Sequence, residues 1–318
     1  MTGAVQTQGP RPVLVTGAGG LIGHRLVRSL HEAGRPVVAM DRVPVDLPVP
    51  TAMAEIGDVH ALYRAIDTHD VGSIAHCGGV SGPMLGRENP GKLVEINVGG
   101  TRDIAEAARL LAARNGSCRL VFCSSLAVYG NQAQDGIAED APLLSTDMYG
   151  ASKIAAEAIL RAYAAQHGVS ALSLRITWVY GPRRTTDCVI RTMLEDALTG
   201  RPTRMAFGRG FRRQFVHIDD VAAAIRLALD APAPCYTAYN VSGGVDPTLD
   251  EIADIVARVV PGADIALEPG PDPVDGGLGR LDIGRIAEDL GHVPAVALET
   301  GIAAYADWLR GQLQKGKA

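Results

Sequence analysis

Short apolar runs alternate with longer amphipathic stretches over the first half of the chain. Val13–Val15 is a β-branched run that ends in a glycine cluster, and apolar positions then recur at helical spacing as far as Gly34. A short apolar run bounded by turn residues is typical of a buried strand, whereas recurrence at three and four residues indicates an amphipathic helix. The pattern predicts strands at 13–15, 36–40, 73–75, 120–122 and 171–174, and helices at 21–33, 93–113 and 148–167.

Strands that alternate with helices form right-handed βαβ units, whose strands assemble into a parallel sheet covered on both faces. We therefore expect an α/β fold with a Rossmann-type, doubly wound parallel sheet and a smaller mixed C-terminal region, because from about Trp178 the alternation loosens and Gly and Pro become denser. Strands at 215–217 and 239–241 are expected to return to the main sheet. The expected boundaries are 1–10 for a disordered leader, 11–177 for the sheet domain with 214–244 returning to it, and 178–213 with 245–318 for the smaller region.

Composition excludes several classes of protein. The chain has 318 residues, 47% apolar and 20% charged, with a formal net charge of -5. This mild charge argues against non-specific binding to nucleic acid. No apolar stretch approaches the roughly 20 residues that span a membrane, and the polar N-terminus does not have the profile of a secretory signal. Five cysteines without metal-binding spacing predict reduced thiols in the cytoplasm and no metal site.

The glycine cluster Gly17-Ala18-Gly19-Gly20-Leu21-Ile22-Gly23 lies between the first predicted strand and its helix. Glycines at 17, 20 and 23 allow a tight turn, close approach of backbone N–H groups to a pyrophosphate, and close packing of helix on strand. This context predicts a dinucleotide site that includes Leu21 and Ile22.

Acidic residues after the next strands refine the choice of dinucleotide. Asp41 follows the second strand, where a carboxylate binds ribose hydroxyls and repels a 2′-phosphate, which favours NAD over NADP. Arg42 weakens this preference, because an arginine there can contact a phosphate. Asp58 has two readings of equal weight, contact with the adenine edge or N-cap of a helix. We also expect Val59, Cys77 and Ile176 to line the cofactor site.

Tyr149 and Lys153 lie four residues apart on the helix predicted at 148–167, and therefore on one face. An ammonium beside a phenol favours the phenolate, which can take a proton from an alcohol or return one to a carbonyl. Ser125 follows the strand at 120–122. Because ligands collect at the carboxyl ends of strands in open α/β sheets, Ser125 is expected to bind a substrate oxygen.

Together these residues make the chain resemble the extended short-chain dehydrogenase/reductase family, in its NAD-dependent epimerase/dehydratase branch. The resemblance covers nearly the whole chain, on the ordered motifs G-A-G-G-L-I-G, S-S-L-A-V-Y-G, Y-G-A-S-K, L-R-I-T-W-V-Y-G-P and R-R-Q-F-V-H-I-D-D-V. It implies a catalytic triad of Ser125, Tyr149 and Lys153 beside NAD, with Lys153 also on the nicotinamide ribose and Asn97 supporting the cofactor side. It further implies a carbohydrate substrate and a homodimer built on the helices at 93–113 and 148–167.

The chain departs from the family pattern around the substrate. Leu126 and Ala127 stand where sugar dehydratases carry an acidic pair, and elimination of water needs an acid and a base, so dehydratase chemistry is discounted. Trp178 replaces the asparagine that helps nucleotide-sugar epimerases to hold a diphosphate. Arg213 matches a phosphate-binding arginine of the family, although Gln214 replaces the common aspartate.

Other residues indicate an acidic substrate. The stretch Gly78-Gly79-Val80-Ser81 resembles sugar-acid dehydrogenases such as uronate dehydrogenases, in which the serine contacts the sugar carboxylate. Substrate-binding candidates are thus Ser81, Ser125, Leu126, Trp178, Arg183, Arg213 and Arg280, with Arg184 as a further source of positive charge.

The leading hypothesis is an NAD-dependent enzyme that oxidises a secondary alcohol on a carbohydrate, in a nucleotide-sugar 4-epimerase type of reaction through a keto intermediate. The alternative is an NAD-dependent dehydrogenase of a sugar acid or another polyol without a nucleotide. A catalytically inactive NAD-binding protein is the third reading, and the intact Ser125, Tyr149 and Lys153 count against it.

Overall fold

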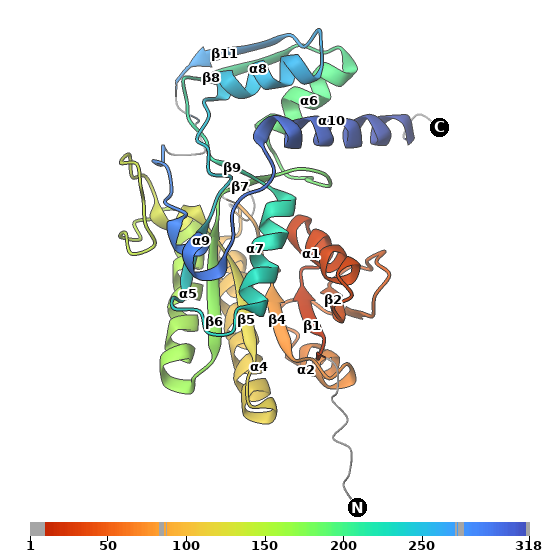
Figure 1. Cartoon of the computed structure of the whole chain (residues 1–318), viewed down its shortest axis with the longest axis vertical. Coiled ribbons are helices and arrows are strands. Elements are labelled where there is room, and N and C mark those ends of the chain that lie inside the picture. The colour runs from red at the N-terminus through yellow and green to blue at the C-terminus, as the bar shows by residue number, and fades with distance from the viewer. Residues whose placement is uncertain (1–9, 83–85, 87, 271, 273–276, 316–318) are drawn as a thin grey trace, which may run out of the picture.

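The computed structural model describes residues 10–82, 86, 88–270, 272 and 277–315. The leader expected at 1–10 therefore lies almost entirely outside the described residues. A seven-stranded parallel sheet forms the centre of the molecule, with strand order β10-β6-β5-β4-β1-β2-β3 (Figure 1). Its strands are β1 (Val13–Thr16), β2 (Val37–Asp41), β3 (Thr51–Met53), β4 (Ser73–His76), β5 (Arg119–Ser125), β6 (Ser170–Ile176) and β10 (Ala238–Val241).

Helices cover both faces of this sheet, as alternation along the strands requires. Val13 and Val15 of β1 face one core with the helices α1 (Leu21–Glu32) and α7 (Ile218–Asp230). Leu14 faces the opposite core with α2 (Val59–Thr68), α4 (Gly100–Asn115) and α5 (Met148–His167). The predicted doubly wound sheet is confirmed.

The helix predicted at 93–113 is a continuous helical segment with a change of winding. It comprises α3 (Pro90–Val94), a π-helical turn η1 (Glu95–Gly99) and α4. Asn97 is buried within the π turn. Single π turns inside α-helices are often found at functional sites, because the extra residue redirects a side chain.

The C-terminal half adds a smaller lobe with its own core, at the top of Figure 1. A parallel pair of strands, β8 (Thr203–Arg209) and β11 (Ile265–Pro269), packs there with three helices. These helices are α6 (Val189–Thr199), α8 (Leu249–Val259) and α10 (Leu298–Lys315). Its core contains Met193, Leu249, Ile252 and Ile302.

Two expected boundaries are corrected. The strand at 239–241 returns to the main sheet as predicted, beside β6. The strand at 215–217 does not: β9 (Phe215–His217) pairs with β7 (Trp178–Tyr180) in a separate two-stranded sheet. In addition, α9 (Gly284–Leu290) was assigned to the smaller region, yet its Ile286 and Leu290 pack in the core of the main sheet.

Along the residues that the structure describes, no helix is both long enough and apolar enough to cross a membrane.

Candidate active site

The glycine cluster forms the turn between β1 and α1 and fits a dinucleotide. Gly17 adopts a φ of 68°, and a Cβ at Gly23 would lie 2.1 Å from the Gly17 carbonyl oxygen. Gly20 is the N-cap of α1 and makes no side-chain capping bond, so the first N–H groups of a 12-residue helix face the turn. Such an N-terminus binds a pyrophosphate without further side chains. The residues that would hold the phosphates of NAD are Gly17, Gly20, Leu21, Ile22 and Gly23.

Asp41 lies at the end of β2, directly beside this turn. Its Oδ2 accepts a hydrogen bond from the Gly19 backbone N–H at 2.8 Å, and its Oδ1 accepts one from Val43 at 3.2 Å. A carboxylate so fixed fits the ribose hydroxyls next to the pyrophosphate. The neighbouring Arg42 is exposed.

The two readings of Asp58 are separated by the structure. Its Oδ1 accepts a hydrogen bond from Ala61 N at 3.0 Å and caps α2. Asp58 and Val59 also line a small hollow together with Thr16 and Met40. The capping role is therefore shown, and contact with adenine stays a prediction for both residues.

Cys77 follows β4 and contacts Cys123 of the neighbouring strand, with the two sulfur atoms 3.5 Å apart. This hydrogen bond, together with removal from water, raises the pKa of the Cys77 thiol well above its usual value. Cys77 is thus a neutral thiol and no nucleophile. All five cysteines are free, as expected.

Tyr149, Lys153 and Ser125 come together at the carboxyl end of the sheet. Lys153 Nζ donates a hydrogen bond to the Cys123 carbonyl oxygen at 2.9 Å and lies 5.8 Å from the centroid of the Tyr149 ring. Tyr149, only 9% exposed, and Ser125 both line one cavity. The helical spacing places the ammonium beside the phenol, as the sequence predicted.

Buried polar contacts hold these groups in place. Ser124 Oγ donates to Glu157 Oε1 at 2.6 Å, and the same carboxylate pairs with the Arg175 guanidinium at 2.7 Å. This network connects β5, α5 and β6 behind the catalytic residues. Fixed neighbours of this kind keep reacting groups in one geometry.

Asn97 makes side-chain hydrogen bonds to two neighbouring segments. Its side-chain oxygen accepts from Val80 N at 2.8 Å, and its Nδ2 donates to Val80 O at 3.1 Å and to Ser152 Oγ at 3.0 Å. The π turn of η1 directs this side chain inward. Asn97 therefore ties the segment after β4 to the catalytic helix α5, while direct contact with NAD stays a prediction.

His76 ends β4 beneath the site. Burial lowers the pKa of His76 to about 3, and the nearby Lys153 ammonium adds to the effect. The imidazole is therefore neutral, and its Nδ1 shares a hydrogen bond of 2.7 Å with Thr16 Oγ1. His76 therefore carries no positive charge that would repel the Lys153 ammonium.

A cavity of about 390 Å³ opens above these residues. Its volume lies within the range of small-molecule sites. Predicted site residues on its wall are Ile22, Ser81, Ser125, Leu126, Tyr149, Ile176 and Trp178. Leu126 and Ala127 begin a short 3-10 turn, η2 (Leu126–Tyr129), so no acidic pair follows Ser125.

Arg213 lies behind Trp178 and does not line this cavity. Its guanidinium pairs with the Asp272 carboxylate, and the two side chains are 5% and 9% exposed. The Trp178 ring covers it at 4.7 Å. Gln214, which replaces the family aspartate, joins β9 to the segment below the lobe: its Nε2 donates to Gly279 O and its Oε1 accepts from Leu281 N.

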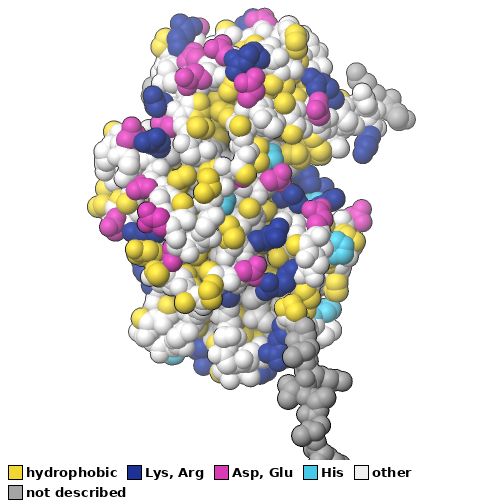
Figure 2. All heavy atoms as spheres, in the orientation of Figure 1, with side chains coloured by type: hydrophobic (Ala, Val, Ile, Leu, Met, Phe, Trp, Pro, Cys, Tyr) yellow, Lys and Arg dark blue, Asp and Glu magenta, His cyan; other side chains and the backbone are white. Residues whose placement is uncertain are grey.

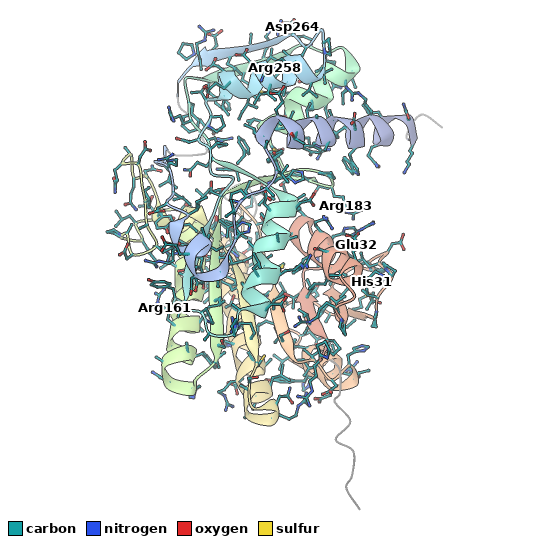
Figure 3. All side chains as sticks on the ribbon, in the orientation of Figure 1. His31, Glu32, Arg161, Arg183, Arg258 and Asp264 are labelled. Atoms are coloured by element: carbon teal, nitrogen blue, oxygen red, sulfur yellow. The ribbon has the colours of Figure 1, made fainter. Side chains whose placement is uncertain are left out.

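The other predicted basic residues lie apart from the cavity. Arg183 is exposed (Figure 3) and close to His24, whose pKa is lowered to about 4 by burial and then by Arg183. Figure 2 shows Lys and Arg side chains gathered where α1 reaches the surface. Arg280 is also exposed, and its backbone N–H binds Asp135. The expectation that Arg183, Arg213 and Arg280 contact the substrate therefore has no support from the cavity wall, whereas Arg184 lies on it.

Comparison with known proteins shows the family of the chain. The model of the NAD dependent epimerase/dehydratase family matches residues 13–242. The chain belongs to this family. A UDP-glucose 4-epimerase of Mycolicibacterium smegmatis is 32% identical over 316 residues, which are 95% of this chain and 99% of that protein.

Two further members show the range of the family. A dTDP-glucose 4,6-dehydratase of Streptomyces antibioticus is 27% identical, over 94% of this chain and 92% of that protein. The crystal structure of the Thermus thermophilus UDP-glucose 4-epimerase in complex with NAD matches with a TM-score of 0.83 and 29% identity, over 94% of this chain and 99% of that one. As a member of the NAD-dependent epimerase/dehydratase family, the chain is an enzyme that uses NAD.

Thr177 on the cavity wall was not among the predicted site residues, and Arg184 was expected only as a further source of positive charge. Thr177 is 4% exposed, and its hydroxyl makes no hydrogen bond to the described residues. Arg184 Nε is likewise buried without a partner in that part of the chain. Thr177 follows directly after a strand end, which is a signal the sequence offers. The selection of Arg184 over its neighbour depends on the turn at Arg183, whose φ is 71°, and no spacing rule reveals it.

Proposed function

We propose that the enzyme interconverts two epimers of a nucleotide-linked sugar at a secondary alcohol carbon, through a keto intermediate. The observation that carries this proposal is the placement of Tyr149 and Ser125 on one wall of the cavity with Lys153 behind them. The similarity to UDP-glucose 4-epimerases over nearly the whole chain supports the nucleotide sugar as substrate.

In this mechanism Tyr149 takes the proton of the substrate hydroxyl. The Lys153 ammonium stabilises the phenolate, and its hydrogen bond to the Cys123 carbonyl fixes where that charge lies. The Ser125 hydroxyl donates a hydrogen bond to the same substrate oxygen. NAD, when bound to the glycine turn, supplies the acceptor and later the donor of the hydride. Rotation of the ketone in the cavity exposes its other face, and Tyr149 then returns the proton.

Dehydratase chemistry is disfavoured in spite of the dehydratase relatives. Elimination of water from a sugar needs an acid and a base at adjacent carbons. Leu126 and Ala127, which follow Ser125 on the cavity wall, offer neither.

A net dehydrogenase of a sugar acid is the second candidate. Trp178 in place of asparagine and the Arg213–Asp272 pair favour it, because both remove expected contacts with a diphosphate. The two reactions differ in the fate of the hydride, which returns to the sugar in one and leaves as NADH in the other.

The deciding experiment incubates NAD-loaded enzyme with UDP-glucose, UDP-glucuronate and free glucuronate. We expect a mixture of epimers from a UDP-sugar, seen by NMR, without net absorbance of NADH. Stoichiometric NADH that forms only with the free sugar acid contradicts the epimerase and supports the second candidate. The cytoplasmic location and the homodimer on α4 and α5 stay predictions.

A further inference from the structure

The arginine that the family pattern assigns to phosphate binding is already paired inside the protein. Arg213 Nη2 lies 2.5 Å from Asp272 Oδ2, and the Trp178 and Phe211 rings lie 4.7 and 5.6 Å from the guanidinium. An anion that bound here would have to displace a buried carboxylate and leave it without its partner. Breaking a buried ion pair is costly, because one charge stays buried and uncompensated.

Arg184 has the opposite situation. Its guanidinium is fixed by hydrogen bonds to two backbone carbonyl oxygens, Val179 O at 2.6 Å and Asp187 O at 3.0 Å. Its buried Nε makes no hydrogen bond to the described residues, and within the same residues no carboxylate lies at ion-pair distance. Arg184 is thus a positioned cation whose charge no carboxylate in the described part of the chain neutralises.

This cation lies on the wall of the catalytic cavity, on the side formed by β7 and the loop that follows it. The Trp178 ring lies 6.0 Å from the Arg184 guanidinium and 4.7 Å from that of Arg213. Among the described residues of the cavity wall, Asp147 is the one acidic side chain, and it caps α5: it accepts hydrogen bonds from Gly150 N and Ser145 Oγ, both at 2.9 Å. An anionic group that enters the cavity therefore meets the guanidinium of Arg184, the one arginine among the described lining residues.

We propose that Arg184 binds the anionic group of the substrate in place of Arg213, and so decides which substrates the site accepts. The inference rests on the proposed function in that it assumes a charged carbohydrate derivative. Carboxylate and phosphate oxygens both match the guanidinium fork. A sugar carboxylate and the diphosphate of a nucleotide sugar are the two sources of this chemistry.

The test measures binding, so it does not depend on turnover. UDP, glucuronate and neutral glucose are titrated into the NAD-loaded protein by calorimetry, for the natural chain and for Arg184→Met, Arg184→Lys and Arg183→Met. Arg183→Met is the matched control, because it removes the adjacent, exposed arginine that does not line the cavity.

We expect Arg184→Met to weaken the anionic ligand by at least about tenfold, since hydrogen bonds to charged groups contribute 1.5–3 kcal/mol. Arg184→Lys should recover part of this loss, and Arg183→Met should change affinity less than about twofold. The affinity for NAD, measured alone, should stay unchanged in all variants. If Arg184→Met loses affinity for UDP, the diphosphate is the anionic group that Arg184 binds. If it loses affinity for glucuronate, that group is the carboxylate.

The proposal is overturned by equal affinities of natural protein and Arg184→Met, by a parallel loss of NAD affinity, or by natural protein that binds none of the anionic probes. Circular dichroism of Arg184→Met guards against a folding defect, and the lysine variant preserves the test if methionine disturbs the loop. The two claims fail in different measurements. If the natural protein epimerises a UDP-sugar but Arg184→Met binds the anionic probes as well as the natural protein does, this inference fails and the proposed reaction stands. If Arg184→Met loses affinity for an anionic probe but the natural protein epimerises no UDP-sugar, the proposed reaction fails and this inference stands.

Discussion

Tyr149 is the side chain on which the proposed proton transfer depends. Replacement by phenylalanine removes the phenol oxygen and keeps the ring in its 9% exposed position. We expect turnover in Tyr149→Phe to fall by about 10²- to 10⁴-fold, the usual contribution of a positioned acid or base. The affinity for NAD, followed by calorimetry, should change little, because the glycine turn is untouched.

Tyr163→Phe is the matched control, since this tyrosine lies on the same helix and its hydroxyl binds Glu106 outside the cavity. Near-normal turnover is expected for the control. Equal activities of the two variants would remove Tyr149 from the mechanism.

At the residue scale, spacing in the sequence predicted which side chains lie together when they belong to the same helix or follow a strand end. Four residues on one helix bring Tyr149 and Lys153 together, and the strand end places Ser125 beside them. Arg213 and Asp272 are 59 positions apart in the sequence, and no spacing rule pairs them. The same limit explains why Arg183 and Arg184 were both expected to offer positive charge to the substrate, although of the two only Arg184 lines the cavity.

The turn between β1 and α1 depends on glycine for space as well as for conformation. A methyl group at Gly23 would overlap the Gly17 carbonyl, 2.1 Å away, so α1 must shift from β1 and the cofactor turn with it. We expect Gly23→Ala to lower the affinity for NAD by about tenfold or more and to lower the melting temperature by several degrees. The reason is that overpacking costs about 1–3 kcal/mol.

Gly311→Ala in α10 is its control, because no atom lies within 4 Å of the added methyl group. This variant should be as stable as the natural chain or slightly more so, as alanine favours helices by roughly 1 kcal/mol over glycine. A Gly23→Ala protein with natural NAD affinity and melting temperature would contradict the packing argument.

At the element scale, periodicity predicted the type of structure better than its partners. The strands at 13–15, 73–75 and 120–122 all appear, and the helix at 148–167 has the predicted bounds. The strand at 215–217 also appears, but it pairs with β7 instead of entering the main sheet. The strands at 215–217 and 239–241 look alike in sequence, since both are short and apolar. Their partner strands are decided by tertiary contacts, which the alternation of side chains along a strand does not reveal.

At the scale of the whole molecule, the main sheet and the lobe have separate cores, and one strand pair, β7 and β9, contributes to a core of each. Phe215 of β9 packs in the core of the lobe, whereas Val216 packs in the core of the main sheet. Sequence located this transition near Trp178, because the βαβ alternation stops there. It did not reveal that α9 returns to the main core, since a helix of seven residues has too little periodic signal.

The division into a main domain and a lobe predicts which strands NAD and the substrate each stabilise. We expect NAD to contact the glycine turn in the main domain, while β8 and β11 form a two-stranded sheet in the lobe with a separate core. Small sheets of this kind open locally at lower free energy than a central sheet. NAD at 100 times its dissociation constant should therefore slow amide exchange in β1, β4 and β5, by raising the free energy of opening by up to about 2.7 kcal/mol. The exchange rates in β8 and β11 should stay unchanged.

Substrate should act differently, because the cavity is lined by both Ser125 of the main sheet and Trp178, which packs against the core of the lobe. Addition of UDP or a UDP-sugar to the NAD complex is expected to slow exchange in β8 and β11 as well, which hydrogen exchange with mass spectrometry resolves by segment. Leu110→Ala on the far side of α4 serves as the control, since its side chain is exposed and lines neither ligand site. If NAD alone protects the lobe strands as strongly as the central strands, the molecule opens as one cooperative unit, and the two cores do not respond separately.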